Sequence, residues 1–332
     1  MEKNILNKTI ENSNTEPLVS IIVITYNSTT HVLETLESIR DQTYANIELI
    51  ITDDASTDDT FEKCVQWIDK NSARFSNTII IKSPVNLGIS ANCNKGVKAA
   101  NGDWIKLIAA DDVLLNDAIE SNIGFIKRAN EKVDIVHSES IYYRNNFDEQ
   151  DRIEGEVFGD QLIANKDSTA EIQYQILLRG CHVNTPTVFV NKEVFSEVGL
   201  FDEQFRNIED WPMWIRVADA GIKFHFLNKP TVRYRMHDTS VSNQVPGGKL
   251  YKELSLTEWP IYKKLVINNV SKFEKFLILA LEQRRRLMIK AGLNRNNSLS
   301  RSLDYLSIWP IKKLQLLAER NAFNKLKKRI KK

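Results

Sequence analysis

The sequence predicts an α/β protein in which a mainly parallel sheet carries helices on both faces and is followed by a helical C-terminal region. Two observations predict this class. Up to about residue 135, short runs of β-branched residues alternate with segments of helical periodicity, which is typical of parallel strands joined by crossover helices. From residue 249 onward, only helical patterns occur.

The first elements alternate regularly. LVSIIVITY (18–26) is a short, nearly continuous apolar run, as expected of a strand buried on both faces, and TTHVLETLESIRDQ after it has helical spacing. NIELIITDD is a second strand, and the helix in STDDTFEKCVQWIDK can be capped by Ser56 or Thr57. NTIIIKS is a third strand, and GISANCNKGVKAA is a helix that Asn101-Gly102 ends.

The later elements are mixed in type. DWIKLIAADD and DIVHSESIYY continue the strands, TPTVFVN and TVRYRMH also read as strands, and EDWPMWIRVADAG reads as a helix. We therefore expect a flexible arm over residues 1–17, an α/β domain over 18–245 and a helical region with a basic tail over 246–332.

Composition indicates a cytoplasmic protein. The three cysteines lie far apart and form no C-x-x-C pair, so neither a disulfide framework nor a zinc site is expected. The N-terminal segment is polar and unlike a signal peptide. No apolar run approaches the ~18 residues of a membrane span.

The C-terminal tail differs in charge from the rest of the chain. Residues 311–332 contain nine Lys and Arg against one Glu, a net charge of +8, so the remainder has about −6. Trp309 precedes a stripe of apolar residues with helical spacing, so we expect the tail to lie on the inner face of an anionic membrane. The alternative is a helix packed on the protein with solvated lysines. No nucleic acid is expected, because the body is acidic and has no aromatic-basic groove. The stripe consists of Ile311, Leu314, Ala318, Ala322 and Leu326.

Polar pairs follow three of the predicted strands. Tyr26-Asn27, Asp53-Asp54 and Asp111-Asp112 all stand at carboxyl ends, where ligands bind in open parallel sheets. Carboxylates gathered there repel one another unless a cation or hydrogen-bond donors compensate them, and a hard divalent metal bridging to a phosphate is one solution. Each acidic pair can alternatively form a turn and a helix N-cap. Dinucleotide-binding and P-loop glycine motifs do not occur.

The order of these motifs resembles a known family. VSIIVITYNSTTHVLETLESIRDQTYANIELIITDDASTDDT, followed by NLGISANCNKGVKAANGDWIKLIAADD, closely resembles the nucleotide-sugar domain of family 2 glycosyltransferases, which have the GT-A fold. Five blocks occur in the family's order over residues 18–243. The resemblance implies an inverting enzyme that uses a nucleotide-diphosphate sugar, with UDP as the expected nucleotide.

The resemblance also assigns the donor side residue by residue. Asp54 corresponds to the carboxylate that accepts hydrogen bonds from the uracil edge, with Asp53 beside it. Asp111 is expected to face the ribose or a water of the metal, while Asp112 and His237 are expected to hold Mn²⁺ or Mg²⁺. The remaining residues expected at the nucleotide are Thr25, Tyr26, Asn27 and Asn86.

On the acceptor side, the resemblance implies that Asp210 in NIEDWPMWIRVADAG is the general base and Glu209 its neighbour. Taken alone, these acids can simply stabilise a helix N-terminus. Trp211 is expected to form a wall of the site or an acceptor platform, and His182 in RGCHVNTPT to line the acceptor side. The acceptor implied is a glycan, most simply one linked to a lipid diphosphate, in O-antigen or capsule assembly.

Two other functions are compatible with parts of the sequence. A nucleotidyltransferase would need a Gly-rich basic loop after the first strand, where TYNSTTH has no Gly, Lys or Arg. A non-catalytic, membrane-bound adaptor with a glycosyltransferase-like body would not need the intact acid set. One departure from the family is Ala55 in place of Gly, which is tolerable if that position does not need a positive φ.

Overall fold

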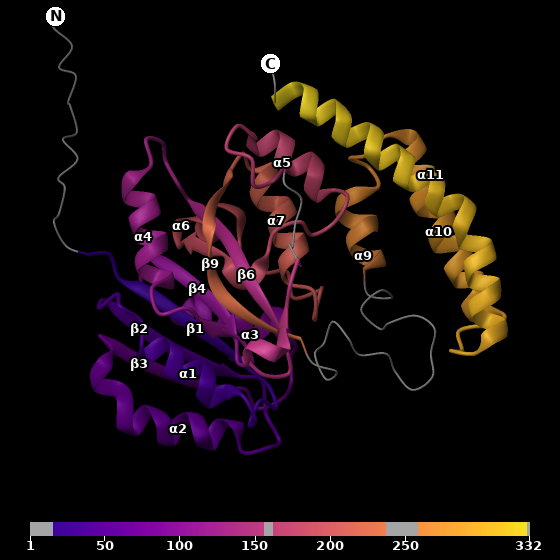
Figure 1. Ribbon diagram of the computed structural model, residues 1–332. Coiled ribbons are helices and arrows are strands. Elements are labelled where there is room, and N and C mark those ends of the chain that lie inside the picture. Colours follow the sequence, from indigo (N-terminus) through magenta and orange to yellow (C-terminus); the bar gives the residue numbers. More distant parts are fainter. Residues whose placement is uncertain (1–15, 156–161, 237–257, 331–332) are drawn as a thin grey trace, which may run out of the picture.

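The predicted fold class is confirmed by the computed structural model, which describes residues 16–155, 162–236 and 258–330 (Figure 1). The sheet has the strand order β3-β2-β1-β4-β8-β6-β9-β5, and β7 pairs with β6 outside this path. The strands are β1 (Val19–Thr25), β2 (Ile47–Asp53), β3 (Asn77–Lys82), β4 (Trp104–Ala109), β5 (Val113–Leu114), β6 (Ile135–Arg144), β7 (Arg152–Ile153), β8 (Phe189–Asn191) and β9 (Phe224–Met236).

The two halves of the sheet differ in strand direction. β3, β2, β1 and β4 are parallel neighbours. β8 runs antiparallel to both β4 and β6, and β6 is parallel to β9. The helices are α1 (Val32–Arg40), α2 (Thr60–Asn71), α3 (Ile89–Ala99), α4 (Ala118–Arg128), α5 (Ala170–Leu177), α6 (Glu193–Val198), α7 (Asp210–Asp219), α9 (Trp259–Ile261), α10 (Lys272–Lys290) and α11 (Ser298–Ile330).

Both faces of the parallel half are buried. Ile21 of β1 belongs to a core shared with α1, α2 and α4, whereas its neighbour Ile22 belongs to a core shared with α3, α5 and α7. Because successive side chains of a strand point to opposite faces, a strand covered on both sides must be apolar at nearly every position. This burial explains the continuous apolar runs of the sequence.

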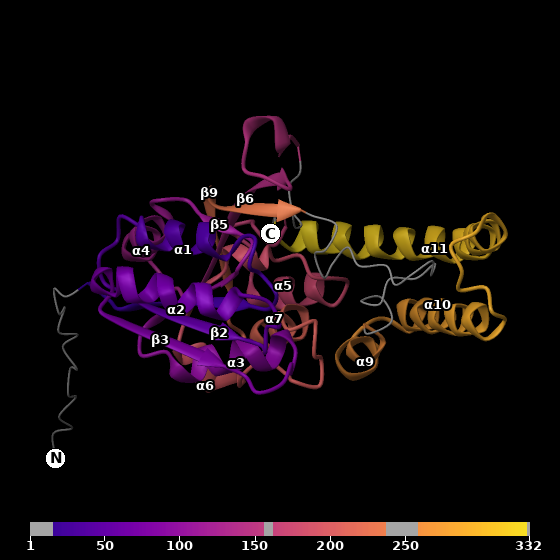
Figure 2. The same ribbon diagram turned by 90° about the horizontal axis from the view of Figure 1, so that it is seen from below.

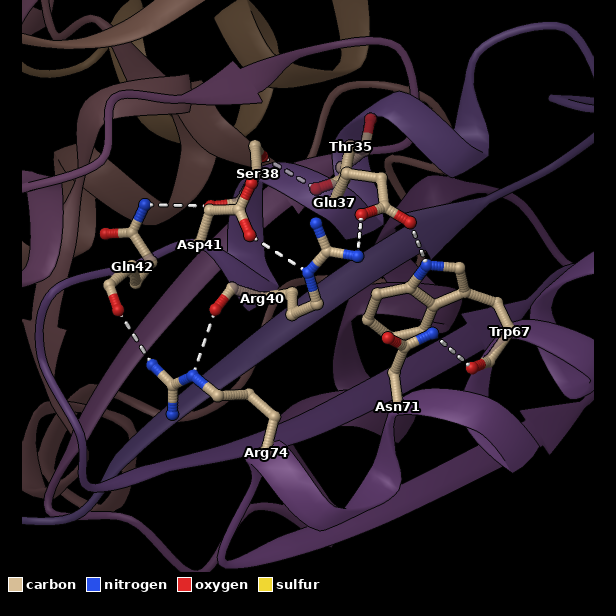
Figure 3. A network of polar contacts seen from close by, with 9 residues as sticks. All are labelled: Thr35, Glu37, Ser38, Arg40, Asp41, Gln42, Trp67, Asn71 and Arg74. Carbon is tan, nitrogen blue, oxygen red and sulfur yellow. Dashed lines mark hydrogen bonds and ion pairs between the residues drawn. The ribbon is translucent and has the colours of Figure 1, made fainter.

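Arg74 fixes the connection between α1 and β2 (Figure 3). Its guanidinium donates to the backbone carbonyls of Arg40 at 2.9 Å, Gln42 at 2.8 Å and Tyr44 at 2.7 Å. An arginine suits this position because it is always charged and carries five donors. Trp67 of α2 donates to Glu37 of α1 at 2.6 Å, so the two helices are also joined directly.

The predicted strand TPTVFVN is correct only in its second part. Residues 185–187 form a 3₁₀ turn, η3 (Thr185–Thr187), and β8 begins at Phe189. Pro186 has no N–H for a strand ladder, and Thr187 turns its hydroxyl back to the carbonyl of Asn184 at 2.7 Å. Residues 231–236 of the predicted strand TVRYRMH form the end of β9, which begins at Phe224, and His237 lies outside the described residues.

The C-terminal region forms a hairpin of α10 and α11 that projects from the body (Figures 1 and 2). It is attached to the α/β domain by a buried ion pair between Arg179 and Glu274, 2.7 Å apart. In the described part of the chain, no helix combines the length and the apolar character needed to cross a bilayer.

The predicted membrane stripe of the tail faces the protein over most of its length. Leu326 is buried in the core that contains α5 and α7, and Ile311, Ala318 and Ala322 are partly covered. Leu314 is exposed. This stripe thus packs on the protein, as in the alternative interpretation of the sequence. The pattern showed that an apolar face exists but not what covers it.

Candidate functional site

The carboxyl ends of β1, β2 and β4 meet at one edge of the sheet, as the sequence predicted. Thr25 at the end of β1 is paired with Asp53 of β2, and Ile24 is paired with Ala109 of β4. The backbone N–H of Asp54 donates to the carbonyl of Thr25 at 3.0 Å. The two acidic pairs therefore flank the end of β1.

Asp53 holds its own loop. Its fully buried carboxylate accepts hydrogen bonds from the Thr25 hydroxyl at 2.9 Å and from the Ser56 N–H at 2.9 Å, and also from the Ser56 hydroxyl. Thr25 and Ser56 thus supply the donors that a buried carboxylate requires. These contacts give Asp53 a structural role, and the predicted contact of Thr25 and Asp53 with nucleotide stays a prediction.

Asp54 reaches from β2 to the loop before α3. Its two carboxylate oxygens accept the backbone N–H groups of Leu87 at 2.9 Å and Gly88 at 2.7 Å. Gly88 has a φ of 93°, and a Cβ there would lie 2.1 Å from a side-chain carbon of Arg206. Arg206 in turn donates to the backbone carbonyl of Asn86 at 2.7 Å. Asn86 therefore sits on a loop held between Asp54 and Arg206.

Tyr26 and Asn27 project at the exposed end of β1. Asn27 adopts a left-handed φ of 48°, and its side-chain oxygen accepts the backbone N–H of Thr57 at 2.9 Å. Ala55 also has a positive φ, 62°. Alanine therefore replaces the family's glycine at a position where the backbone conformation is strained for any residue with a Cβ. A left-handed conformation costs an L-residue about 1–2 kcal/mol. The hydrogen bonds of Asp53 and Asn27 stabilise this strained loop.

Arg235, which the sequence analysis missed, organises the Asp111-Asp112 turn. Its backbone N–H donates to a carboxylate oxygen of Asp112 at 2.9 Å, and its Nε donates to the carbonyl of Asp111 at 2.8 Å. The buried guanidinium also pairs with Glu34 and lies 4.0 Å from the centre of the Phe147 ring. Arg235 stands in the block YRMHDTSVS, from which only the histidine was selected; His237 itself lies outside the described residues.

The Asp111-Asp112 pair suits a hard cation. Burial raises the pKa of Asp112 well above its usual range, and the charge of Asp111 adds to this effect. Among the described residues, no three His, Cys, Asp or Glu side chains gather as a metal site. Mg²⁺ is commonly held by one or two carboxylates together with substrate phosphates. The pair therefore fits an ion that a diphosphate, or a residue such as His237, helps to bind.

Asp210 is held by a short chain of hydrogen bonds. The buried Trp214 donates through Nε1 to the Thr185 hydroxyl at 3.0 Å, and that hydroxyl donates to Asp210 Oδ2 at 2.9 Å. Cys181 Sγ lies 3.6 Å from the same oxygen. Because the Trp214 indole occupies a lone pair of Thr185, the hydroxyl hydrogen is directed at Asp210. Thr185 lies in the NTPT segment that the sequence placed on the acceptor side, although its contact with Asp210 was not foreseen.

The other residues predicted on the acceptor side lie in different surroundings. Trp211 is buried, donates to the Leu177 carbonyl at 2.7 Å and packs against Tyr262, so it forms a wall. The ring of His182 meets Phe323 of α11 edge-on, with centroids 6.1 Å apart.

Electrostatic effects connect Asp210 with the donor side. Burial raises the pKa of Cys93 in α3, and so do the charges of Glu209, Asp210 and Asp54. On the other side of β1, burial lowers the pKa of Lys106 to about 7, an effect that the charge of Asp112 opposes. Lys106 donates to the carbonyl of Pro186, next to Thr185. Glu209, Asp210 and Asp54 therefore all lie within electrostatic range of Cys93, and Asp112 lies within that range of Lys106.

Comparison with known proteins agrees with this arrangement. A family model described as Glycosyl transferase family 2 matches residues 20–199. The chain belongs to this glycosyltransferase family. A relative from Escherichia coli, named UDP-Glc:alpha-D-GlcNAc-diphosphoundecaprenol beta-1,3-glucosyltransferase WfaP, is 32% identical over 225 residues, which are 68% of this chain and 80% of the relative.

This glycosyltransferase is also similar to a second relative and to a solved structure. The amylovoran biosynthesis glycosyltransferase AmsB of Erwinia amylovora is 27% identical over 65% of this chain and 69% of its own. The crystal structure of S. aureus TarS 1-349 in complex with UDP-GlcNAc is 16% identical, with a TM-score of 0.57 over 89% of this chain and 80% of that one. At this identity, the likeness to TarS supports the fold alone.

The environment of Glu209 predicts how the unfolding free energy of this glycosyltransferase depends on pH. Burial, together with the charge of Asp210, raises the pKa of Glu209 from 4.5 to about 8. Between pH 4.5 and about 8, Glu209 keeps its proton in the folded protein but has released it in the unfolded chain. The free energy of unfolding therefore falls as pH rises through this range. Glu209→Gln is expected to remove that part of the decline in unfolding free energy, measured by chemical denaturation across this pH range.

The matched control is Glu197→Gln, which changes a glutamate at an exposed site. An unchanged dependence of the unfolding free energy on pH in Glu209→Gln would contradict the raised pKa of Glu209.

Proposed function

We propose that this glycosyltransferase transfers a hexose or N-acetylhexosamine from a UDP-sugar to a hydroxyl of a lipid-diphosphate-linked glycan, with inversion at the anomeric carbon. The reaction serves the biosynthesis of a bacterial surface polysaccharide such as O-antigen or capsule. The observation that carries the proposal is the Asp210 carboxylate, oriented by Thr185 and within electrostatic range of Cys93, as Asp54 is. Support for the substrates comes from the names of WfaP and AmsB.

In the proposed reaction, Asp210 accepts the proton of the acceptor hydroxyl. The acceptor oxygen forms a bond to the anomeric carbon from the face opposite the diphosphate. The bond from that carbon to the diphosphate oxygen breaks, and its electron pair leaves with UDP. One displacement of this kind inverts the configuration. A general base contributes ~10²–10⁴-fold, and positioning with electrostatic stabilisation supplies the remainder.

The neighbouring residues have supporting roles in this proposal. Thr185 keeps Asp210 in one orientation, and Glu209, whose pKa is raised by burial and by the charge of Asp210, is protonated near neutral pH and adds no negative charge beside it. Asp112, with Asp111 and His237, would hold Mn²⁺ or Mg²⁺, which when bound neutralises charge on the departing diphosphate. Asp54 and the backbone around Asn86 and Tyr26 are proposed to bind the nucleoside.

The test is a donor screen with purified protein. UDP-, GDP-, CDP- and dTDP-sugars are each incubated with divalent metal and a short-chain prenyl-diphosphate-linked N-acetylhexosamine, and products are identified by mass and by the NMR coupling of the new anomeric proton. We expect transfer from a UDP-sugar with inversion. Retention of configuration, or transfer from another nucleotide only, would contradict the proposal. Formation of a nucleotide-sugar from a nucleoside triphosphate and a sugar phosphate would instead assign a nucleotidyltransferase.

A further inference from the structure

The outer side of α11 carries an apolar surface that the protein does not cover. The side of this helix that faces the body is the one containing Ile308, Gln315, Leu326 and Ile330, all at least partly covered. Leu306, on the opposite side, is 69% exposed.

The exposed residues follow one another at helical spacing. Leu299, Leu303, Leu306, Pro310, Lys313 and Leu317 recur at steps of three and four, which places them on one side of the helix. Leu299 and Trp309 are 63% and 52% exposed, and Leu317 is 48% exposed. From Leu299 to Leu317 this stripe extends about 27 Å at the rise of an α-helix. We call it the outer stripe of α11; single exposed leucines are ordinary, but a continuous stripe marks an interaction surface.

Charge identifies the partner that fits the outer stripe. α11 contains eight Lys and Arg residues against two acids; Lys313 stands within the stripe, and Arg320 follows Leu317 by three positions on the same side of the helix. A second copy of this chain would bring the same cations against themselves. An anionic lipid surface complements them, accepts the apolar side chains at its boundary and suits a tryptophan such as Trp309.

The hairpin connects this surface to the acceptor side of the site. The Arg179–Glu274 ion pair and the contact of His182 with Phe323 join α10 and α11 to the segment 179–187, which contains the Thr185 that holds Asp210. These contacts link α11 to the segment that carries Thr185, the hydrogen-bond partner of Asp210.

We propose that the outer stripe of α11 docks the enzyme onto an anionic lipid bilayer, at the interface and without crossing it. The stripe predicted from sequence, which ends at Leu326, anchors the helix to the protein, and the opposite side binds lipid. The benefit for catalysis rests on the lipid-linked acceptor of the proposed function; the binding itself does not.

The experiment is flotation of the full chain with vesicles of phosphatidylcholine, alone or mixed with phosphatidylglycerol. We expect binding to the mixed vesicles at low salt and release at high salt. Leu306→Gln/Leu317→Gln, which changes no charge, is expected to lower the bound fraction by about tenfold or more. Lys313→Gln/Arg320→Gln is expected to lower binding to the anionic vesicles by a similar factor.

The matched control is Leu33→Gln/Val85→Gln, which replaces two exposed apolar residues of the body and is expected to float like the unmodified protein. The proposal is overturned if the unmodified chain stays in solution with anionic vesicles, or if the Leu306/Leu317 variant floats equally well. It is also overturned if these two leucines hold a dimer in solution without lipid. UDP binding, measured on the same proteins, separates the two proposals, because flotation without any nucleotide binding would refute only the proposed function.

Discussion

Asp210→Asn is expected to lower the rate of sugar transfer by about 10²-fold or more while UDP binding stays close to that of the unmodified protein. The amide fills the same space and can still accept the Thr185 hydrogen bond, but it cannot take a proton from the acceptor. The two quantities are measured on one preparation, with calorimetric titration of UDP and a transfer assay.

Asp219→Asn is the control for this substitution, because it removes one carboxylate from the other end of α7. Its transfer rate should match that of the unmodified protein. Near-normal turnover of Asp210→Asn would remove Asp210 from the role of base. Loss of UDP binding together with transfer would indicate that Asp210 organises the donor side instead.

Chelation of divalent metal is expected to abolish transfer, and Mn²⁺ or Mg²⁺ to restore it. Asp112→Asn should then weaken UDP binding by about tenfold or more when metal is present, because the amide is a poorer ligand than a carboxylate. In chelator the variant and the unmodified protein should bind UDP equally, since the amide oxygen can still accept the backbone N–H of Arg235.

The exposed Asp41→Asn serves as the control for removing a negative charge. Full transfer activity in chelator would refute the metal role. If Asp112→Asn weakens UDP binding equally with and without metal, the residue acts on the shape of the turn rather than through an ion.

The parallel half of the fold was predictable because its signals are local. β1 and β2 are covered on both faces, so their apolar runs are nearly unbroken, and the acids that end them mark the edge of the sheet. The boundary of β8 was not predictable from β-propensity, because Pro186 and the Thr187 hydroxyl impose a turn on residues that otherwise favour strands.

Long-range contacts explain what the sequence did not reveal about the site. An arginine in a strand normally indicates a solvent-facing position. Arg235 is buried only because Glu34 and Phe147, distant in sequence, surround it. Likewise, Thr185 gains its role from Trp214. The binding of nucleotide, metal and acceptor by the residues assigned to them stays a prediction.

Arg235 also makes the Asp111-Asp112 turn a late product of folding. The residue it fixes, Asp111, is 124 positions earlier in the chain, and Glu34 is 201 positions earlier. Contacts of such separation form only after long loops have closed, which is slow. During synthesis, strands β1 to β4 can therefore assemble while the Asp111-Asp112 turn still lacks the group that holds it. The nascent protein would acquire most of its parallel sheet before the final geometry of the Asp111-Asp112 turn.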